Sequence, residues 1–260
     1  MDVYFVCNLE PTRINTDVTF RVTGKTPQRW DAITGETGAY VDFCADEKGT
    51  TIPLDFEPWE SAFFIFSHDA APSKPTPVEL NAPLPEPLPI TGEWKMKLEG
   101  YGFETLETNI STLASWTDAE RTRHFSGTGQ YEIEFDLPAE RIVNGTKTTL
   151  DLGQVGTIAE VELNGKSMGV SWMAPHRLDI TRAVHAGKNK LVVLVTDTLI
   201  NYVSGLQAPP EVPVELQPRL GSPNPDIYIL GRKRPSEMDE TDLPPSGLIG
   251  PVQIKWQAMR

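Results

Sequence analysis

The chain has 260 residues, of which 39% are hydrophobic and 23% charged, and its formal net charge is −13. This length allows one large core or two modest ones, and we expect two domains. The excess of acid would repel nucleic-acid backbones and anionic membranes, whereas a neutral glycan meets no such repulsion. No apolar run approaches the roughly 20 residues that span a bilayer.

The N-terminus lacks the basic and apolar regions of a secretory signal, and Met1 is followed at once by an expected strand. We therefore expect an internal start within a longer protein. The missing signal leaves the cellular compartment open.

Short apolar runs separated by turn residues organise the first part of the chain. Their spacing of roughly ten residues predicts a small immunoglobulin-like β-sandwich over residues 1–67. Phe63, Phe64 and Phe66 are expected in its core. Trp30 lies in a predicted turn, where it either closes the end of the sandwich or stacks on a sugar. The expected strands are 3–6, 18–22, 40–43, 52–56 and 62–66.

Cysteine and histidine give no metal-binding pattern. Cys7 and Cys44 either form a disulfide or remain as small buried thiols. The sequence contains no CxxC, HxH or HExxH spacing and no G-x-S-x-G motif. We expect no cofactor and no metal site from these residues.

A proline-rich segment, residues 68–91, separates the first domain from a second one at 92–260. Its seven prolines predict an extended, semi-rigid linker. In the second domain, residues 130–137 and 159–163 alternate apolar and polar side chains, as strands with one wet face do. Asn164-Gly165 then predicts a tight hairpin. These features indicate a second β-sandwich and an all-β protein.

Several sequence runs carry a resemblance to a known family. GTGQYEIEFDLP, LDLGQVGTIAEVELNGKSMGVSWMAPHRLDIT, AGKNKLVVLVTDT and LPPSGLIGPVQI resemble the galactose-binding-like jelly-roll β-sandwich, a sugar-binding domain of many glycoside hydrolases. The chain as a whole, including DVYFVCN and TFRVTGKTPQRWDAITGE, is similar to the C-terminal part of the glycoside hydrolase family 106 α-L-rhamnosidases.

The resemblance implies that the catalytic barrel is absent from this chain, that a missing N-terminal catalytic domain is the partner, and that the location is extracellular or periplasmic. A structural calcium ion is compatible with it, although no EF-hand-like cluster marks the ligands. Asp179 in Leu-Asp-Ile-Thr matches a recurring position of such sandwiches. We expect Asp179 to accept backbone N–H bonds.

Carbohydrate recognition needs an aromatic ring and hydrogen-bonding or charged groups. The loop containing Trp172, His176 and Arg177 offers all of these and is the first predicted site. Trp172 as a core residue, and His176 and Arg177 as solvated side chains, stay open as alternatives. A second group is His124 with Trp116. A third group, Tyr202 and Arg232, lies in the long proline-rich stretch 201–245, whose length is typical of functional or mobile loops.

Three functions follow from these observations. The first is a non-catalytic region that binds plant or bacterial glycans as part of a polysaccharide-degrading enzyme. The second is glycoside hydrolysis by the fragment itself, which would need two suitably spaced carboxyl groups. The i, i+2 pairs of acids on the predicted strands, Glu132 with Glu134 and Glu160 with Glu162, are more typical of a solvated face. The third is structural support without any sugar contact.

Overall fold

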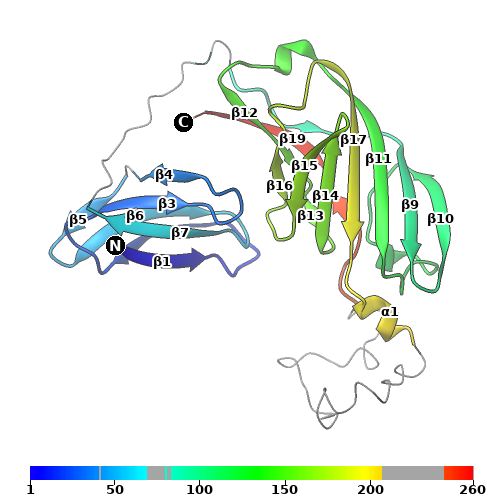
Figure 1. Cartoon of the computed structure of the whole chain (residues 1–260), viewed down its shortest axis with the longest axis horizontal. Helices are drawn as coiled ribbons and strands as arrows, with labels where there is room; N and C mark the ends of the chain where they lie inside the picture. Colours follow the sequence, from blue (N-terminus) through cyan, green and yellow to red (C-terminus); the bar gives the residue numbers. More distant parts are fainter. Residues whose placement is uncertain (41, 69–79, 81–82, 207–242, 260) are drawn as a thin grey trace, which may run out of the picture. The chain divides into compact units, whose positions relative to one another are not determined.

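The computed structural model describes residues 1–40, 42–68, 80, 83–206 and 243–259 (Figure 1). Two compact units make up the chain. The smaller comprises Met1–Leu84 with Asn144–Thr146 and Gln257–Arg260, and the larger comprises Pro85–Val143 and Lys147–Trp256. The described part is nearly all-β, with antiparallel strand pairing and one short α-helix, α1 (Ile200–Ser204). The predicted all-β class is confirmed.

The smaller unit is a sandwich of two antiparallel sheets. One sheet has the strand order β1-β7-β3-β4 and the other β2-β6-β5. Its buried core lies between the sheets and is rich in phenylalanine, and the ring of Phe20 contacts those of Phe64 and Phe66. The strands are β1 (Asp2–Cys7), β2 (Ile14–Phe20), β3 (Thr26–Trp30), β4 (Thr37–Ala39), β5 (Cys44–Asp46), β6 (Gly49–Phe56) and β7 (Ser61–Ser67).

Two aromatic residues of this unit lie elsewhere than predicted. Phe63 and Phe64 are neighbours on β7, so their side chains point to opposite faces of the sheet, and only Phe64 enters the core. Trp30 ends strand β3, opposite Phe63 in the register, and does not close the sandwich end. Both Phe63 and Trp30 therefore belong to the outer face.

The cysteines also differ from both expectations. Cys7 lies on β1 and Cys44 on β5, which belong to different sheets. Both thiols are free and exposed. They are neither a disulfide nor buried.

The larger unit is built from a six-stranded sheet, a four-stranded sheet and a two-stranded ribbon. Their orders are β10-β9-β11-β17-β14-β15, β16-β12-β19-β8 and β13-β18. The strands are β8 (Leu88–Pro89), β9 (Trp94–Gly100), β10 (Phe103–Ile110), β11 (Thr128–Leu137), β12 (Thr146–Asp151), β13 (Gln154–Val155), β14 (Ile158–Leu163), β15 (Lys166–Ser171), β16 (Arg177–Asp179), β17 (Gly187–Thr196), β18 (Leu248–Gly250) and β19 (Gln253–Ala258).

The apolar alternation read from the sequence positions the core of the larger unit. On β11, Tyr131, Ile133 and Leu137 are buried, whereas Gln130 and Glu134 are exposed. The β14–β15 hairpin turns at Asn164 and Gly165, which both have positive φ, at 53° and 76°. The core is shared by the six- and four-stranded sheets.

The end of the predicted linker is part of this sandwich. Leu88 and Pro89 pair with β19, and Ile90 is buried in the core. The linker prolines at 72, 75 and 77 lie outside the described residues. In the described part of the chain, no helix is long and apolar enough to cross a membrane.

Candidate functional site

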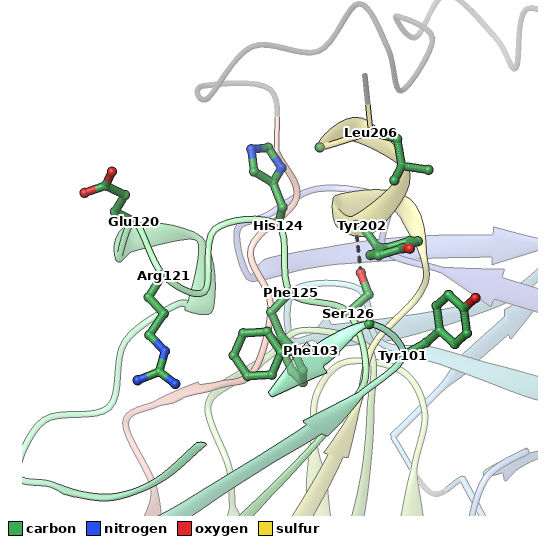
Figure 2. Close-up of a pocket in the computed structure, with 11 residues that line it drawn as sticks. Tyr101, Phe103, Glu120, Arg121, His124, Phe125, Ser126, Tyr202 and Leu206 are labelled. Carbon is green, nitrogen blue, oxygen red and sulfur yellow. Dashed lines mark hydrogen bonds between the residues drawn. The ribbon is translucent and has the colours of Figure 1, made fainter. Parts of the chain in front are cut away.

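A cavity of about 270 Å³ lies at one end of the larger sandwich, where the β9–β10 turn, the loop 120–126 and helix α1 meet (Figure 2). These three segments are far apart in the sequence. The residues that line the cavity are Tyr101, Gly102, Phe103, Glu120, Arg121, His124, Phe125, Ser126, Tyr202, Gly205 and Leu206.

The floor of the cavity is aromatic and rigidly held. Phe125 is buried, with its ring centroid 4.6 Å from that of Phe103 and 4.9 Å from that of Trp116. The backbone N–H of Phe125 donates to Thr122 O, and the Thr122 hydroxyl donates to Trp116 O at 2.6 Å. The loop is thereby fixed from below, so a ligand would meet a preformed surface.

A capping box starts the loop. The side-chain oxygen of Ser115 accepts from Thr117 N, and the carboxylate of Asp118 accepts from Ser115 N, around the 3₁₀ helix η1 (Trp116–Asp118). This reciprocal pair satisfies backbone donors that a short helix leaves open. It aligns the chain that leads to His124.

Helix α1 is attached to the loop by two side chains. Tyr202 N donates to Ser126 Oγ at 3.0 Å, the bond drawn in Figure 2. His124 Nδ1 lies 3.2 Å from Asn201 O. Nδ1 also lies 3.3 Å from Ser204 Oγ, so the role of this nitrogen depends on the tautomer; with a hydrogen on Nδ1 it donates to the carbonyl oxygen, which only accepts. In a neutral ring Nε2 is then an acceptor that can meet a ligand hydroxyl.

Two tyrosines form the rim of the cavity. The ring centroids of Tyr101 and Tyr202 are 6.0 Å apart and the rings are nearly perpendicular, at 84°. Tyr101 is 80% exposed, and in Figure 2 its ring stands at the mouth below Tyr202. Ring faces presented in this way can pack against the C–H groups of a sugar.

Charged groups lie on the opposite side of the cavity. Glu120 and Arg121 are both exposed, and Arg121 pairs with Glu104 at 4.0 Å. An exposed ion pair at this distance contributes little to stability, so its charged groups can exchange partners with a ligand. The residues that line the cavity thus include two tyrosines, a histidine, an arginine and a glutamate, and in Figure 2 the Glu120 side chain points away from the tyrosines.

Trp116, predicted to bind sugar, is a core residue. It is 3% exposed, and its indole N–H donates to the hydroxyl of Tyr131 at 2.6 Å. Leu248 N donates to the same hydroxyl at 3.2 Å. Burial raises the pKa of Tyr131 to about 12, although these two hydrogen bonds oppose the rise. With no free ring face, Trp116 supports the cavity from below.

The first predicted site, the loop with Trp172, His176 and Arg177, is divided by the fold. Trp172 is 60% exposed and is not part of the core, so it can still offer a ring. His176 is 6% exposed, its Nδ1 lies 2.9 Å from Ser171 Oγ, and burial lowers its pKa. A ligand in solvent cannot reach His176.

Arg177 is turned to an internal carboxylate. Its Nε donates to Asp151 Oδ2 at 3.2 Å, and Lys255 Nζ donates to the same oxygen at 2.6 Å. Burial opposes ionisation of Asp151, but the bonds from Lys255 and Gly153 N and the charge of Arg177 outweigh it, so the pKa of Asp151 is lowered. Arg177 therefore serves the interior more than the surface.

The other predicted residues have separate places. Asp179 Oδ1 accepts from Thr181 N at 2.9 Å and from the Thr181 hydroxyl at 2.6 Å, next to the turn that follows β16. Arg232 lies outside the described residues. The fold brings His124 and Tyr202, from two different predicted groups, into one cavity.

The strand acids lie on the outer face of the six-stranded sheet. Glu132 pairs with Lys190 at 3.1 Å and with Lys95 at 3.8 Å. Glu160 and Glu162 are exposed on β14. Asp197 is a separate partly buried acid: burial raises its pKa, while its Oδ1 accepts from Thr157 Oγ1 at 2.7 Å. No group of three or more His, Cys, Asp or Glu side chains that could hold a metal occurs among the described residues.

Sequence reasoning missed Tyr101, Arg121 and Ser126. Tyr101 and Gly102 form the turn between β9 and β10, and Gly102 has a positive φ of 68°. A Tyr-Gly pair between two alternating segments was a signal of this exposed aromatic turn. Nothing in the local sequence placed it beside helix α1.

Comparison with known proteins relates this unit to glycoside hydrolases. Residues 115–233 match the family model described as glycosyl hydrolase 2 galactose-binding domain-like. A protein of Formosa agariphila named "Putative beta-glucuronidase" is 36% identical over 186 residues, which are 66% of this chain and 16% of that protein. A solved rhamnosidase structure from Novosphingobium sp. PP1Y matches 98% of this chain with 26% identity and a TM-score of 0.69.

The chain spans only 16% of the Formosa protein and 23% of the Novosphingobium rhamnosidase. Its relatives are thus much larger glycoside hydrolases. The narrower expectation of glycoside hydrolase family 106 stays a prediction. Residues 115–233, whose described part lies in the larger unit, are thus similar to the glycosyl hydrolase 2 galactose-binding-like domain.

Proposed function

We propose that this chain is a carbohydrate-binding accessory region of a larger glycoside hydrolase, and that the Tyr101–Tyr202 cavity holds the glycan. The observation that carries the proposal is the combination of two tyrosine rings, the His124 imidazole and the Arg121 guanidinium around one preformed opening. Ring faces can pack on the C–H side of a pyranose while the polar groups bond to its hydroxyls.

The relatives suggest which glycans to test. One is named as a rhamnosidase and another as a "Putative beta-glucuronidase". Plant and bacterial oligosaccharides that contain rhamnose or glucuronate are therefore the first ligands. The net charge of −13 favours the neutral ones.

Calorimetric titration and affinity electrophoresis with these glycans test the proposal. Tyr202→Ala should weaken binding about 5- to 150-fold, the loss of roughly 1–3 kcal/mol expected for an aromatic contact. Trp172→Ala is the matched control, because Trp172 is an exposed ring of the same unit outside the cavity. Loss on Trp172→Ala alone would assign the glycan to the 172–177 loop, and absence of binding to any of them would refute the proposal.

Hydrolysis by this chain alone has less support. Among the described residues that line the cavity, only Glu120 has a carboxyl group, whereas both routes of glycoside hydrolysis use two. We expect no turnover of aryl rhamnosides or glucuronides. Turnover that Glu120→Gln abolishes would establish an active site here instead.

Structural support is the second candidate function. It is favoured by the small share of each relative that the chain spans. A chain that binds none of the glycans, yet stabilises a glycosidase, would fit this function. The two roles are compatible, because one uses the cavity and the other uses different surfaces.

A further inference from the structure

A row of three aromatic rings crosses the outer face of the smaller unit, with exposed rings at its two ends and the half-buried ring of Phe63 between them. Phe5 on β1, Phe63 on β7 and Trp30 on β3 are direct cross-strand neighbours. The ring centroids of Phe5 and Phe63 are 5.1 Å apart. Phe5 is 57% exposed and Trp30 40% exposed. We call this row, with the parallel row Val3, Ile65 and Gln28, the aromatic face; within the second row Ile65 is buried, at 4% exposed.

The aromatic face contains no charged side chain in its two rows. Its one polar residue, Gln28, accepts a hydrogen bond from Trp30 Nε1 at 3.2 Å. Val3, beside Phe5, is also exposed. This composition matches the centre of a protein interface, which is rich in aromatic residues and poor in charge.

Phe5, Phe63 and Trp30 do not belong to the core cluster of the smaller unit. Its core is made on the opposite side of the same sheet, where Phe64 and Phe66 pack against Phe20. Contiguous apolar surface left in water is unfavourable and marks a site of interaction. The exposed rings of Phe5 and Trp30, with Val3 beside them, therefore make this face a candidate docking surface.

Chemistry favours one occupant over two others. A glycan needs hydrogen-bonding groups beside the rings, but the amide oxygen of the one polar residue in these rows is already bonded to Trp30. A second copy of this chain would bring together two molecules that each have a net charge of −13. An apolar surface of a different protein domain meets neither difficulty.

The length of the similar proteins points to such a domain. Almost the whole chain, 98%, corresponds to only 23% of the Novosphingobium rhamnosidase. We propose that the aromatic face docks on the catalytic part of a glycoside hydrolase, which buries Phe5, Phe63 and Trp30. This inference rests on the proposed role as an accessory region and adds the surface through which the catalytic part is held.

Site-specific photo-crosslinking in the source organism tests the docking. The photoreactive residue p-benzoylphenylalanine replaces Trp30 in the full chain, and mass spectrometry identifies the cross-linked peptides. The control places the same residue at Trp59, an exposed tryptophan in the β6–β7 turn of the same unit. We expect peptides of a glycosidase catalytic part to cross-link at position 30 at least about tenfold more than at position 59, because surface contact is required.

The double variant Phe5→Thr, Trp30→Thr gives a second measurement. Threonine suits a strand, so circular dichroism and thermal melting should show a folded protein. A catalytic part supplied as a separate polypeptide should no longer co-purify with this variant. It should still co-purify with Trp59→Asn, because asparagine tolerates the positive φ of 63° at that position.

Cross-links only to copies of this chain, only to polysaccharide, or equally at both positions would overturn the docking. So would unchanged co-purification of the double variant. Glycan titration of the Tyr202→Ala variant reports on the cavity alone. Failure of the docking and failure of the proposed glycan binding can therefore be told apart.

Discussion

The 172–177 loop and the cavity at the β9–β10 turn contain the same kinds of side chain but use them in opposite ways. Each has an aromatic ring, an imidazole and a guanidinium. In the loop, His176 and Arg177 bond to Ser171 and Asp151, so their polar atoms serve the fold. In the cavity, His124 and Arg121 are exposed beside the tyrosines. Suitable residue types close together in the sequence therefore do not make a binding site, because their polar groups can bond to internal partners instead of a ligand.

Removal of the Asp151 carboxylate should have the largest effect on stability. A small effect would contradict the conclusion that Arg177 stabilises the fold. Asp151→Ala leaves Arg177 and Lys255 without the buried oxygen that both contact. We expect a loss of about 2–3 kcal/mol in the free energy of unfolding, because hydrogen bonds to a charged group are strong. The loss is no larger because water still reaches both cations in part. Urea denaturation measures it.

The control for this change is Glu160→Ala, which removes an exposed carboxylate of β14. It should alter stability by no more than about 0.5 kcal/mol. Glycan binding by folded Asp151→Ala should match that of the unsubstituted protein. Intact stability together with lost binding would return the site to the 172–177 loop.

The Tyr131 hydroxyl beneath the cavity should produce an alkaline transition. Its pKa is raised from 10.0 to about 12 in the folded protein. The folded state holds the phenol proton more tightly than the unfolded state. The associated stability is complete below pH 10 and falls by about 2–3 kcal/mol as the pH rises through the folded pKa.

Tyr131→Phe removes this transition and also leaves Trp116 Nε1 and Leu248 N without their acceptor. We expect a loss of about 1–3 kcal/mol at neutral pH, the cost of buried donors without a partner. Denaturation between pH 8 and pH 12 compares it with Tyr101→Phe, whose hydroxyl belongs to an exposed side chain. A steep alkaline loss that persists in Tyr131→Phe would contradict the assignment.

Gly205→Ala should have the smallest effect on stability and sharpen the cavity side of the comparison. A β-carbon at this position would lie 2.6 Å from His124 Cγ and 3.0 Å from its Nδ1. The imidazole must shift and lose its bond to Asn201 O, at a cost of about 1 kcal/mol. Glycan affinity should fall several-fold in titration, because the ring leaves its place beside Tyr202.

Gly38→Ala is the matched control, since a β-carbon there meets no atom within 4 Å. It should leave both stability and affinity unchanged. Equal affinities of Gly205→Ala and the unsubstituted protein would show that His124 takes no part in binding.

Local patterns predicted much of the fold. Alternation on 130–137 identified the buried face of β11, and Asn164-Gly165 identified the β14–β15 hairpin. The same rule, applied to adjacent Phe63 and Phe64, would have assigned one ring to each face. Reading the whole aromatic cluster as core ignored that period of two.

The candidate site depended on tertiary structure. Tyr101, His124 and Tyr202 lie on three segments, and only the closure of the sandwich brings them together. Trp116 is a residue type that often contacts sugars, but its indole N–H donates to the Tyr131 hydroxyl inside the core. Whether a polar aromatic residue meets solvent or an internal partner is set by contacts between distant segments, which the sequence does not display.

The sequence by itself determined the all-β class, the hairpin and the resemblance to sugar-binding sandwiches, because these follow from side-chain period, turn chemistry and ordered motifs. Only the tertiary structure decided that His176 and Arg177 bond to internal partners and that Tyr101, His124 and Tyr202 line one cavity. It also decided that Phe5, Phe63 and Trp30 share the outer face of one sheet. The physical reason is that burial and hydrogen-bond partnership belong to pairs of residues, whereas periodicity belongs to a single segment.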